Sequence, residues 1–292
     1  MLNTQYTLIP DTRYLIPDTS HLTPMNYYTI PPSPQLAPYV RFFWVFESGE
    51  KPAAPYVYRS MADGCAEILF HYRGVFEDAD EPGVKQSYSL VHAQTQRFRR
   101  FETKDNFSIF GVYLYPDSIP RLFNLPSTDL SNQMPDLASL IGREGKELEE
   151  KMMLAENNSC RVRILSSFLE KRLATKQQLH HGVHAAIRYI IHMNFTLNVQ
   201  QLAEKSCLSA RQFERRFKEE SGFSPKLYSR IIRFQSALNA YEKNSGKSLT
   251  GIAYECGYFD QAHFINDFRE FSGYVPRQYF AGKPEGIEWR DA

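Results

Sequence analysis

Apolar and polar positions alternate in the first part of the chain and follow a helical spacing in the second part. Period-two alternation is clearest at 107–115, and it is typical of strands that bury one face. Further strands are predicted at 39–46, 66–72, 87–92 and 97–101. Asp63-Gly64 predicts a tight turn just before the strand at 66–72. Short strands at this spacing predict a small β-barrel or sandwich.

After residue 116 the apolar positions recur every three or four residues, which is typical of amphipathic helices. Helices are predicted at 117–123, 137–141, 144–155 and 160–173, and then across most of 181–280. The polar segment 175–180 is the predicted domain boundary, and two domains suit a chain of 292 residues. We therefore predict an α+β protein, with a regulatory β-barrel and helices at 25–175, an all-α domain at 181–282 and a tail at 283–292.

The first 24 residues contain a near repeat, in which residues 6–12 reappear as residues 13–19. Both copies are short and interrupted by proline, so they are too brief to form a solenoid. We predict a disordered extension at 1–24. We also expect the biological start to be Met25, which would leave this extension out of the native protein.

The C-terminal part contains the same pattern twice between residues 197 and 279. Each copy has an apolar residue followed by alanine, a tight turn, a polar residue that can cap a helix, and two phenylalanines four positions apart. These residues are Leu202-Ala203, Ser209, Phe213 and Phe217 in the first copy, and Ile252-Ala253, Asp260, Phe264 and Phe268 in the second. The pattern predicts two helix-turn-helix units, unit one and unit two.

The second helix of such a unit packs one face on its partner and places the opposite face in the DNA major groove. At about 100° per residue, the positions opposite the phenylalanines are Arg211, Glu214, Arg215 and Lys218 in unit one, and Gln261, Ala262, Ile265, Asn266 and Arg269 in unit two. Arg can bind guanine, Asn and Gln adenine, Glu cytosine, and Ala and Ile the methyl group of thymine. A solvated charged face is the alternative, but two such faces at matched positions favour base contacts.

A helix predicted at 225–241 joins the two units. Pro225 suits its first turn, and Leu227, Ile231, Phe234 and Leu238 follow helical spacing. A helix of this length would hold the units at a fixed separation. The two recognition helices would then enter successive major grooves on one face of DNA, about 34 Å apart.

Charge and cysteine usage narrow the function classes. Residues 182–283 carry 14 Lys and Arg against 9 Asp and Glu, a net +5, while the remainder carries a net −4. A basic module beside a mildly acidic one suits a nucleic-acid binder. The four cysteines show no CxxC spacing, so neither a zinc site nor a disulfide framework is predicted, and Cys207 and Cys256 are expected in the core. No apolar run approaches the roughly 18 residues of a membrane span, and we expect a cytoplasmic protein without cofactors.

These residues resemble the AraC/XylS family of bacterial transcription regulators over residues 183–280. The residues that carry the resemblance are Leu202-Ala203, Ser209, Phe213, Arg215, Phe217, Gly222, Ser224-Pro225, Ile252-Ala253, Gly257-Tyr258, Asp260, Phe264, Phe268, Gly273, Pro276 and Tyr279. The resemblance implies that both units bind double-stranded DNA and that RNA polymerase is a partner. Asp267 and Glu270 depart from many relatives, and we expect them to lower the DNA affinity of unit two or to make it a polymerase contact.

The first part of the chain resembles the N-terminal domain of one subgroup of these regulators, at residues 36–40, 62–71 and 110–112. This resemblance implies a cupin-like barrel that binds a small effector or forms a homodimer. Aromatic walls with a few polar groups suit a small ligand. The candidate pocket residues are Trp44, Glu67, His71, Tyr72 and Tyr113, although Trp44 and Tyr113 also suit a plain barrel core.

A catalytic role is the alternative to an effector-controlled regulator. His71 and His92 are isolated, so no metal site or metal-dependent enzyme is predicted. A methyl-accepting barrel fused to a DNA-binding module would use Cys65, which follows a glycine in a turn. No basic neighbour in the sequence would stabilise its thiolate, and no catalytic residue is predicted.

Overall fold

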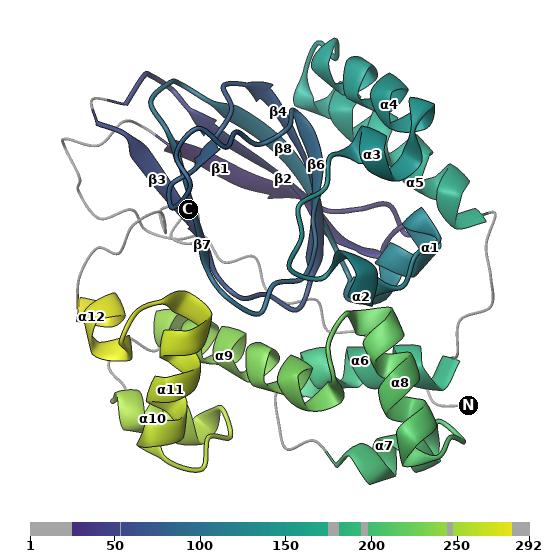
Figure 1. Ribbon diagram of the computed structural model, residues 1–292, viewed down its shortest axis with the longest axis vertical. Coiled ribbons are helices and arrows are strands. Elements are labelled where there is room, and N and C mark those ends of the chain that lie inside the picture. Colours follow the sequence, from purple (N-terminus) through teal and green to yellow (C-terminus); the bar gives the residue numbers. More distant parts are fainter. Residues whose placement is uncertain (1–24, 53, 175–180, 194–197, 244–247, 282–292) are drawn as a thin grey trace.

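The computed structural model describes residues 25–52, 54–174, 181–193, 198–243 and 248–281. The predictions for 1–24, 175–180 and 283–292 lie outside these residues. Residues 25–174 are called the N-terminal region below, and residues 181–281 the C-terminal region. The N-terminal region contains all the described strands followed by several helices, and the C-terminal region contains only helices, as Figure 1 shows, so the predicted α+β fold is confirmed.

The strands of the N-terminal region form two antiparallel sheets. The larger sheet has the order β1 (Met25–Ile30), β2 (Val40–Ser48), β8 (Ser108–Leu114), β4 (Ala66–Arg73) and β6 (Ser89–His92). The smaller sheet has the order β3 (Tyr56–Ser60), β7 (Arg99–Thr103) and β5 (Glu77–Asp78). Because side chains alternate along each strand, the larger sheet presents two different faces.

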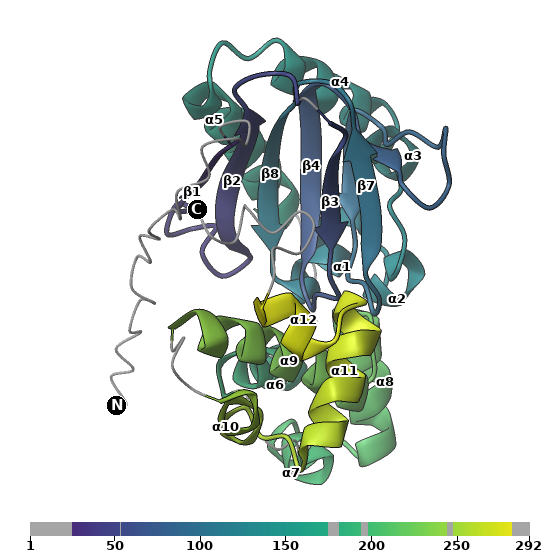
Figure 2. The ribbon, with the colours of Figure 1, turned by 90° about the vertical axis from the view of Figure 1, so that its left-hand side faces the viewer.

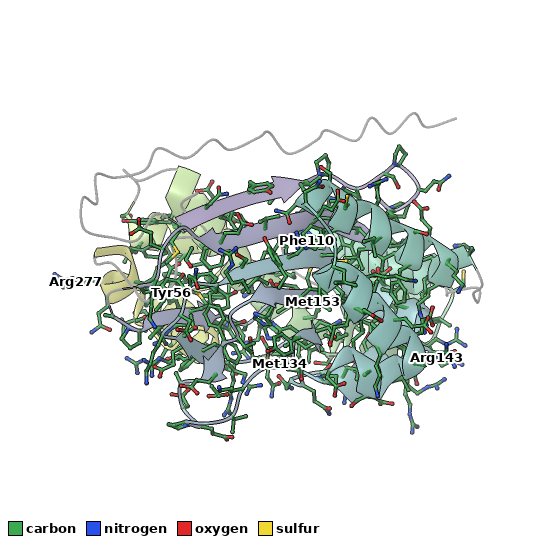
Figure 3. All side chains as sticks on the ribbon, turned by 90° about the horizontal axis from the view of Figure 1, so that it is seen from above. Tyr56, Phe110, Met134, Arg143, Met153 and Arg277 are labelled. Atoms are coloured by element: carbon green, nitrogen blue, oxygen red, sulfur yellow. The ribbon has the colours of Figure 1, made fainter. Side chains whose placement is uncertain are left out.

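One face of the larger sheet packs on helices. Phe43, Phe70 and Phe110 are fully buried on this side. The helical elements after β8 are η1 (Pro116–Ser118), α1 (Ile119–Phe123), α2 (Ser127–Leu130), α3 (Leu137–Ile141), α4 (Arg143–Met153) and α5 (Asn158–Ala174). Seen from above, α3 to α5 and Arg143 lie at one end of the molecule, and Tyr56 of the smaller sheet lies on the other side of the larger sheet (Figure 3).

The opposite face, called the inner face below, packs on the smaller sheet through aromatic rings. The ring of Phe107 lies 4.9 Å from that of Phe76, 5.1 Å from that of Phe46 and 5.3 Å from that of Tyr56. The first two pairs meet edge-on and the third is stacked, and rings at these separations fill space closely. The two sheets therefore share a core of their own, separate from the core under the helices.

The C-terminal region consists of helices in the order expected for two helix-turn-helix units. They are α6 (His181–Met193), α7 (Val199–Lys205), α8 (Ala210–Ser221), α9 (Pro225–Lys243), α10 (Leu249–Glu255), α11 (Gln261–Ser272) and α12 (Pro276–Ala281). Helices α7 and α8 form unit one, α10 and α11 form unit two, and α9 joins them. Phe213, Phe217, Phe264 and Phe268 are all fully buried in one core with α9.

Local signals in the sequence fix where both recognition helices begin and end. Ser209 and Gln212 form a capping box at the start of α8, and the Asp260 carboxylate accepts from the His263 N–H at 2.7 Å at the start of α11. Both helices end on a glycine with positive φ, Gly222 at 85° and Gly273 at 76°. A left-handed residue at this position is a common helix stop.

The turn inside each unit also needs a residue with positive φ. Gly257 supplies it in unit two at φ 76°, and Cys207 occupies the matched position in unit one at φ 54°. The Cys207 side chain is exposed, whereas Cys256 is buried. The expectation that Cys207 belongs to the core is therefore wrong, because the turn conformation points its side chain to the surface.

Replacing Cys207 by glycine should stabilise the protein. A left-handed conformation costs a non-glycine residue about 1–2 kcal/mol, and the greater freedom of glycine in the unfolded chain offsets part of this gain. The free energy of unfolding in urea should rise by about 1 kcal/mol for Cys207→Gly. Cys207→Ala, which keeps the Cβ atom, should give no such gain; equal effects of the two substitutions would contradict the explanation.

Candidate DNA interface and control site

The positions opposite the buried phenylalanines of α8 and α11 are open to solvent. Exposed residues on these faces are Arg211, Glu214, Arg215 and Lys218 on α8, and Gln261, Ala262, Asn266 and Arg269 on α11. Ile265 is half-buried. The structure thus brings the nine predicted DNA-facing residues together as two helix faces, each held rigidly from behind by aromatic packing.

Both recognition helices lie on the same side of the molecule. In Figure 1 they run roughly parallel at either end of α9, and in Figure 2, turned by 90°, α11 lies in front of α8. Helix α9 separates them and is packed against both. A pair of helices with this arrangement can enter two successive turns of one major groove.

The exposed face of α8 carries basic groups that are free to meet phosphates or bases. Arg215 Nη1 lies 3.2 Å from Glu219 Oε1, but both side chains are exposed, so this ion pair is easily broken. Within the described residues, no carboxylate pairs with Arg211 or Lys218. The guanidinium of Arg211, near the start of the helix, is well placed to bind a guanine edge.

One of the two acidic residues of α11 that the sequence placed on the exposed face, Asp267, is buried. Asp267 is only 1% exposed, and Arg230 of α9 donates to its Oδ1 from Nε at 3.1 Å and from Nη2 at 2.7 Å. Arg230 Nη2 also donates to Glu270 at 2.6 Å. We expect both carboxylates to lower the DNA affinity of unit two. This expectation is corrected for Asp267, because its side chain lies inside the interface with α9, where Arg230 balances its charge.

Four of the five candidate pocket residues share the inner face of the larger sheet. Glu67 and His71 alternate with core residues on β4, Tyr113 of β8 pairs with Glu67, and the Trp44 ring packs closely on Gly111 of β8. Tyr72 is one position out of phase, so its side chain lies on the helix-covered face, where Arg161 stacks on its ring at 3.8 Å. Tyr72 therefore cannot line a pocket with the other four.

At the end of the inner face nearest the C-terminal region, aromatic rings lie beside a guanidinium group and a buried carboxyl group. Phe42 and Tyr113 are stacked with 5.1 Å between ring centres, and the Arg41 guanidinium lies 5.1 Å from the Tyr113 ring. Burial, reinforced by the nearby charge of Asp63, raises the pKa of Glu67 to about 8, so this carboxyl is mostly protonated at neutral pH. This group of residues, Arg41, Phe42, Trp44, Glu67 and Tyr113, is called the inner-face cluster.

His71 and Cys65 have properties of core groups. Burial lowers the pKa of His71 to about 4, so its ring is neutral, and it packs 5.9 Å from Phe76. Burial also raises the pKa of Cys65 to about 12, although Arg41 lies 3.5 Å from its sulfur and favours the thiolate. A thiol in this state is a poor nucleophile at neutral pH. No group of three or more potential metal ligands occurs in the described part of the chain.

The N-terminal region holds both recognition helices at their C-terminal ends. The hydroxyls of Ser127 and Ser131 donate to the carbonyls of Glu220 and Gly222 at the end of α8, at 2.8 and 3.2 Å. At the end of α11, Arg59 Nη1 donates to the Ser272 carbonyl at 3.1 Å. Such carbonyls have no partner within their own helix.

The loop at 61–65 makes further contacts with unit two and with α9. The Ala62 N–H donates to the Phe271 carbonyl at 2.9 Å, and Gln235 Nε2 donates to the Ala62 carbonyl at 2.6 Å. Gly64 packs so closely that a Cβ atom there would lie 2.9 Å from Ile232. This loop, called the docking loop, lies between the inner-face cluster and the C-terminal region.

Helix α6 provides a third contact between the regions. Arg188 lies 3.3 Å over the Tyr115 ring and donates to Asp117 at 3.1 Å and to the Pro38 carbonyl at 2.6 Å. His184 is also hydrogen-bonded to Asp117, which is fully buried. No local pattern in the sequence predicts these contacts, because each partner resembles an ordinary surface residue of its own element.

Two parts of the chain match known protein families. Residues 202–282 match the model of a family described as a helix-turn-helix domain, and residues 28–136 match a domain of unknown function (DUF6597). The chain is 28% identical over 160 residues to the HTH-type transcriptional activator RhaS of Escherichia coli (strain SE11). This match covers 55% of the chain and 49% of RhaS, so the chain spans about half the length of the curated relatives it matches.

Several solved structures align with this chain. ToxT from Vibrio cholerae strain SCE256, solved with a bound unsaturated fatty acid, aligns over 91% of this chain and 97% of its own, with a TM-score of 0.43 and 10% identity. The DNA-binding domain of AdpA, solved in complex with a target DNA, aligns over 36% of this chain and 92% of its own, with a TM-score of 0.32 and 27% identity.

No helix in the described ranges is long and apolar enough to cross a membrane.

The contact between α8 and the N-terminal region should weaken as pH rises. Glu220 is 7% exposed, and burial, together with the charge of Asp117, raises its pKa to about 8 against the opposing effect of Arg121. An unfolded Glu ionises near pH 4.3. Between that pH and about 8 the unfolded state loses the proton and the folded state keeps it, so stability falls with rising pH.

Glu220→Gln removes this titration and should raise the melting temperature at pH 8 while changing it little at pH 4.5. Thermal unfolding followed by circular dichroism at both pH values tests this. Glu214→Gln, at an exposed position on the same helix, is the control and should change neither value. Equal shifts for Glu220→Gln at the two pH values would contradict the prediction.

Proposed function

We propose that the chain belongs to the AraC/XylS family through its C-terminal helix-turn-helix domain and that it is a sequence-specific DNA-binding transcription regulator. One observation carries this proposal: two capped recognition helices lie on one side of the molecule with their polar faces open. The relationship to RhaS, a transcriptional activator, supports it. RNA polymerase and a second copy of the chain are further proposed partners, and such a regulator would act in the cytoplasm.

Each recognition helix would read its own half-site. Arg211 and Arg215 would bind guanine edges, and Glu214 would accept from cytosine. In unit two, Gln261 and Asn266 would bind adenine. Lys218 and Arg269, one at the matched position of each helix, would bind phosphates and fix the register of the protein on DNA.

We further propose that a small effector acts through the inner-face cluster. Stacked aromatic rings, one guanidinium and a protonated carboxyl can bind a planar molecule with a polar group at its edge. Asp63 and Cys65 of the docking loop contact this cluster electrostatically, and Ala62 and Gly64 contact the C-terminal region. A ligand that moved the docking loop would change how unit two is held.

Arg215→Ala should weaken binding to the preferred site by roughly 1–3 kcal/mol and relax the base preference at one position of the unit-one half-site. Footprinting would first define a bound site, and fluorescence anisotropy would then measure affinities for single-base variants. Arg143→Ala is a matched control, because Arg143 is also an exposed helical arginine that pairs with a glutamate four positions on, at 2.7 Å. Unchanged base preference in Arg215→Ala would sink the assignment.

Arg59→Ala should loosen unit two and relax the spacing that the protein requires between half-sites. The substitution removes a hydrogen bond to the end of α11, so the affinity ratio between the best spacing and one changed by a base pair should fall about three- to tenfold. Binding to a set of DNA sites with graded spacing measures this ratio. Arg100→Ala, on the same sheet and paired with Asp80 at 3.4 Å, should leave the ratio unchanged.

A further inference from the structure

One large apolar side chain lies uncovered at the reading end of unit two. Phe259 is 86% exposed and stands directly before Asp260, the residue that caps α11. A single exposed apolar residue is common on protein surfaces. Phe259 differs from such a residue because it lies next to the start of α11, and the first residues of a recognition helix are those that contact base edges.

An extra residue in the turn explains why Phe259 is exposed. The two units match at an offset of 50 residues up to Gly257 and of 51 residues from Asp260 onward. In unit one a single residue, the half-buried Leu208, separates the turn residue Cys207 from the helix cap. In unit two Tyr258 takes the buried place, 3% exposed and packed edge-on against Phe264 at 5.2 Å. Phe259 is therefore left without a position in the core.

The exposed surface beside Phe259 is apolar, whereas the matching surface of unit one is charged. Ala262 of α11 stands at the position of Arg211 in α8, and Ile265 stands at the position of Glu214. Ala262 is exposed and Ile265 half-buried, so both are open on the same side of the helix. Arg269, also exposed and with no ion pair among the described residues, follows one turn later as a phosphate contact.

We propose that Phe259, Ala262 and Ile265 form an apolar edge that reads the methyl groups of thymine. Thymine alone among the DNA bases presents a methyl group in the major groove, and small or aromatic apolar side chains can contact it. The bound site is then asymmetric, with an A·T-rich half-site under unit two and guanine and cytosine contacts under unit one. This inference rests on the proposed DNA binding and assigns Phe259 as a specificity-determining residue of unit two.

Replacing thymidine by deoxyuridine tests the proposal, because it removes only the methyl group. On a footprinted site, each deoxyuridine that removes a contacted methyl should weaken wild-type binding about fourfold, the effect of exposing one methyl-sized apolar group. Phe259→Ala should bind the normal site more weakly and show no further loss at the thymine that Phe259 contacts. Phe259→Leu, which keeps an apolar side chain, should retain part of the sensitivity.

Leu154→Ala is the control, since Leu154 is 76% exposed just after α4, in the N-terminal region. It should respond to deoxyuridine as the wild type does. The proposal is overturned if wild-type protein binds the normal and the deoxyuridine half-sites equally. It is also overturned if Phe259→Ala keeps full affinity and loses only transcription activation, since the residue would then contact a protein. Failure of the wild type to select any DNA site would instead refute the proposed function.

Discussion

The hydrogen bonds to the C-terminal ends of α8 and α11 are the contacts on which the arrangement of the molecule depends. The last carbonyls of a helix need donors from outside it, and here Ser127, Ser131 and Arg59 supply them from the N-terminal region. Each helix ends on a glycine without a side chain, so the donors can approach the backbone closely. The separation of the two recognition helices is thus set by two constraints, α9 between them and the N-terminal region above them.

The docking loop joins this constraint to the proposed effector site. Both backbone groups of Ala62 are hydrogen-bonded: the N–H donates to the Phe271 carbonyl, and the carbonyl accepts from the Gln235 side chain. Three residues further on, Cys65 contacts Arg41 of the inner-face cluster. A short segment fixed at both ends transmits a displacement, because its neighbours are close-packed and cannot absorb it. The proposed control of DNA binding by the N-terminal region would therefore need no large rearrangement.

The two units show how one scaffold can carry two different reading surfaces. The units share residue types at several buried positions, such as Phe213 and Phe264, because these rings fill equivalent space against a partner helix. The exposed positions have no such packing constraint, and they differ in charge and polarity. Asp267 is buried and bound by Arg230, whereas the matched residue of unit one is the half-buried Arg216.

The sequence determined the features that depend on neighbours a few positions apart. Helix starts, the glycine stops, the core phenylalanines and the outward faces of α8 and α11 all follow from local spacing. The period-two alternation along β4 places Tyr72 and Glu67 on opposite faces of the sheet, and this separation is visible in the sequence. The sequence does not show which of the two faces packs on helices. Only the tertiary structure decided contacts such as that of Arg59 with Ser272, which lie 213 residues apart. No local pattern encodes them, because they form only when two separately folded surfaces meet.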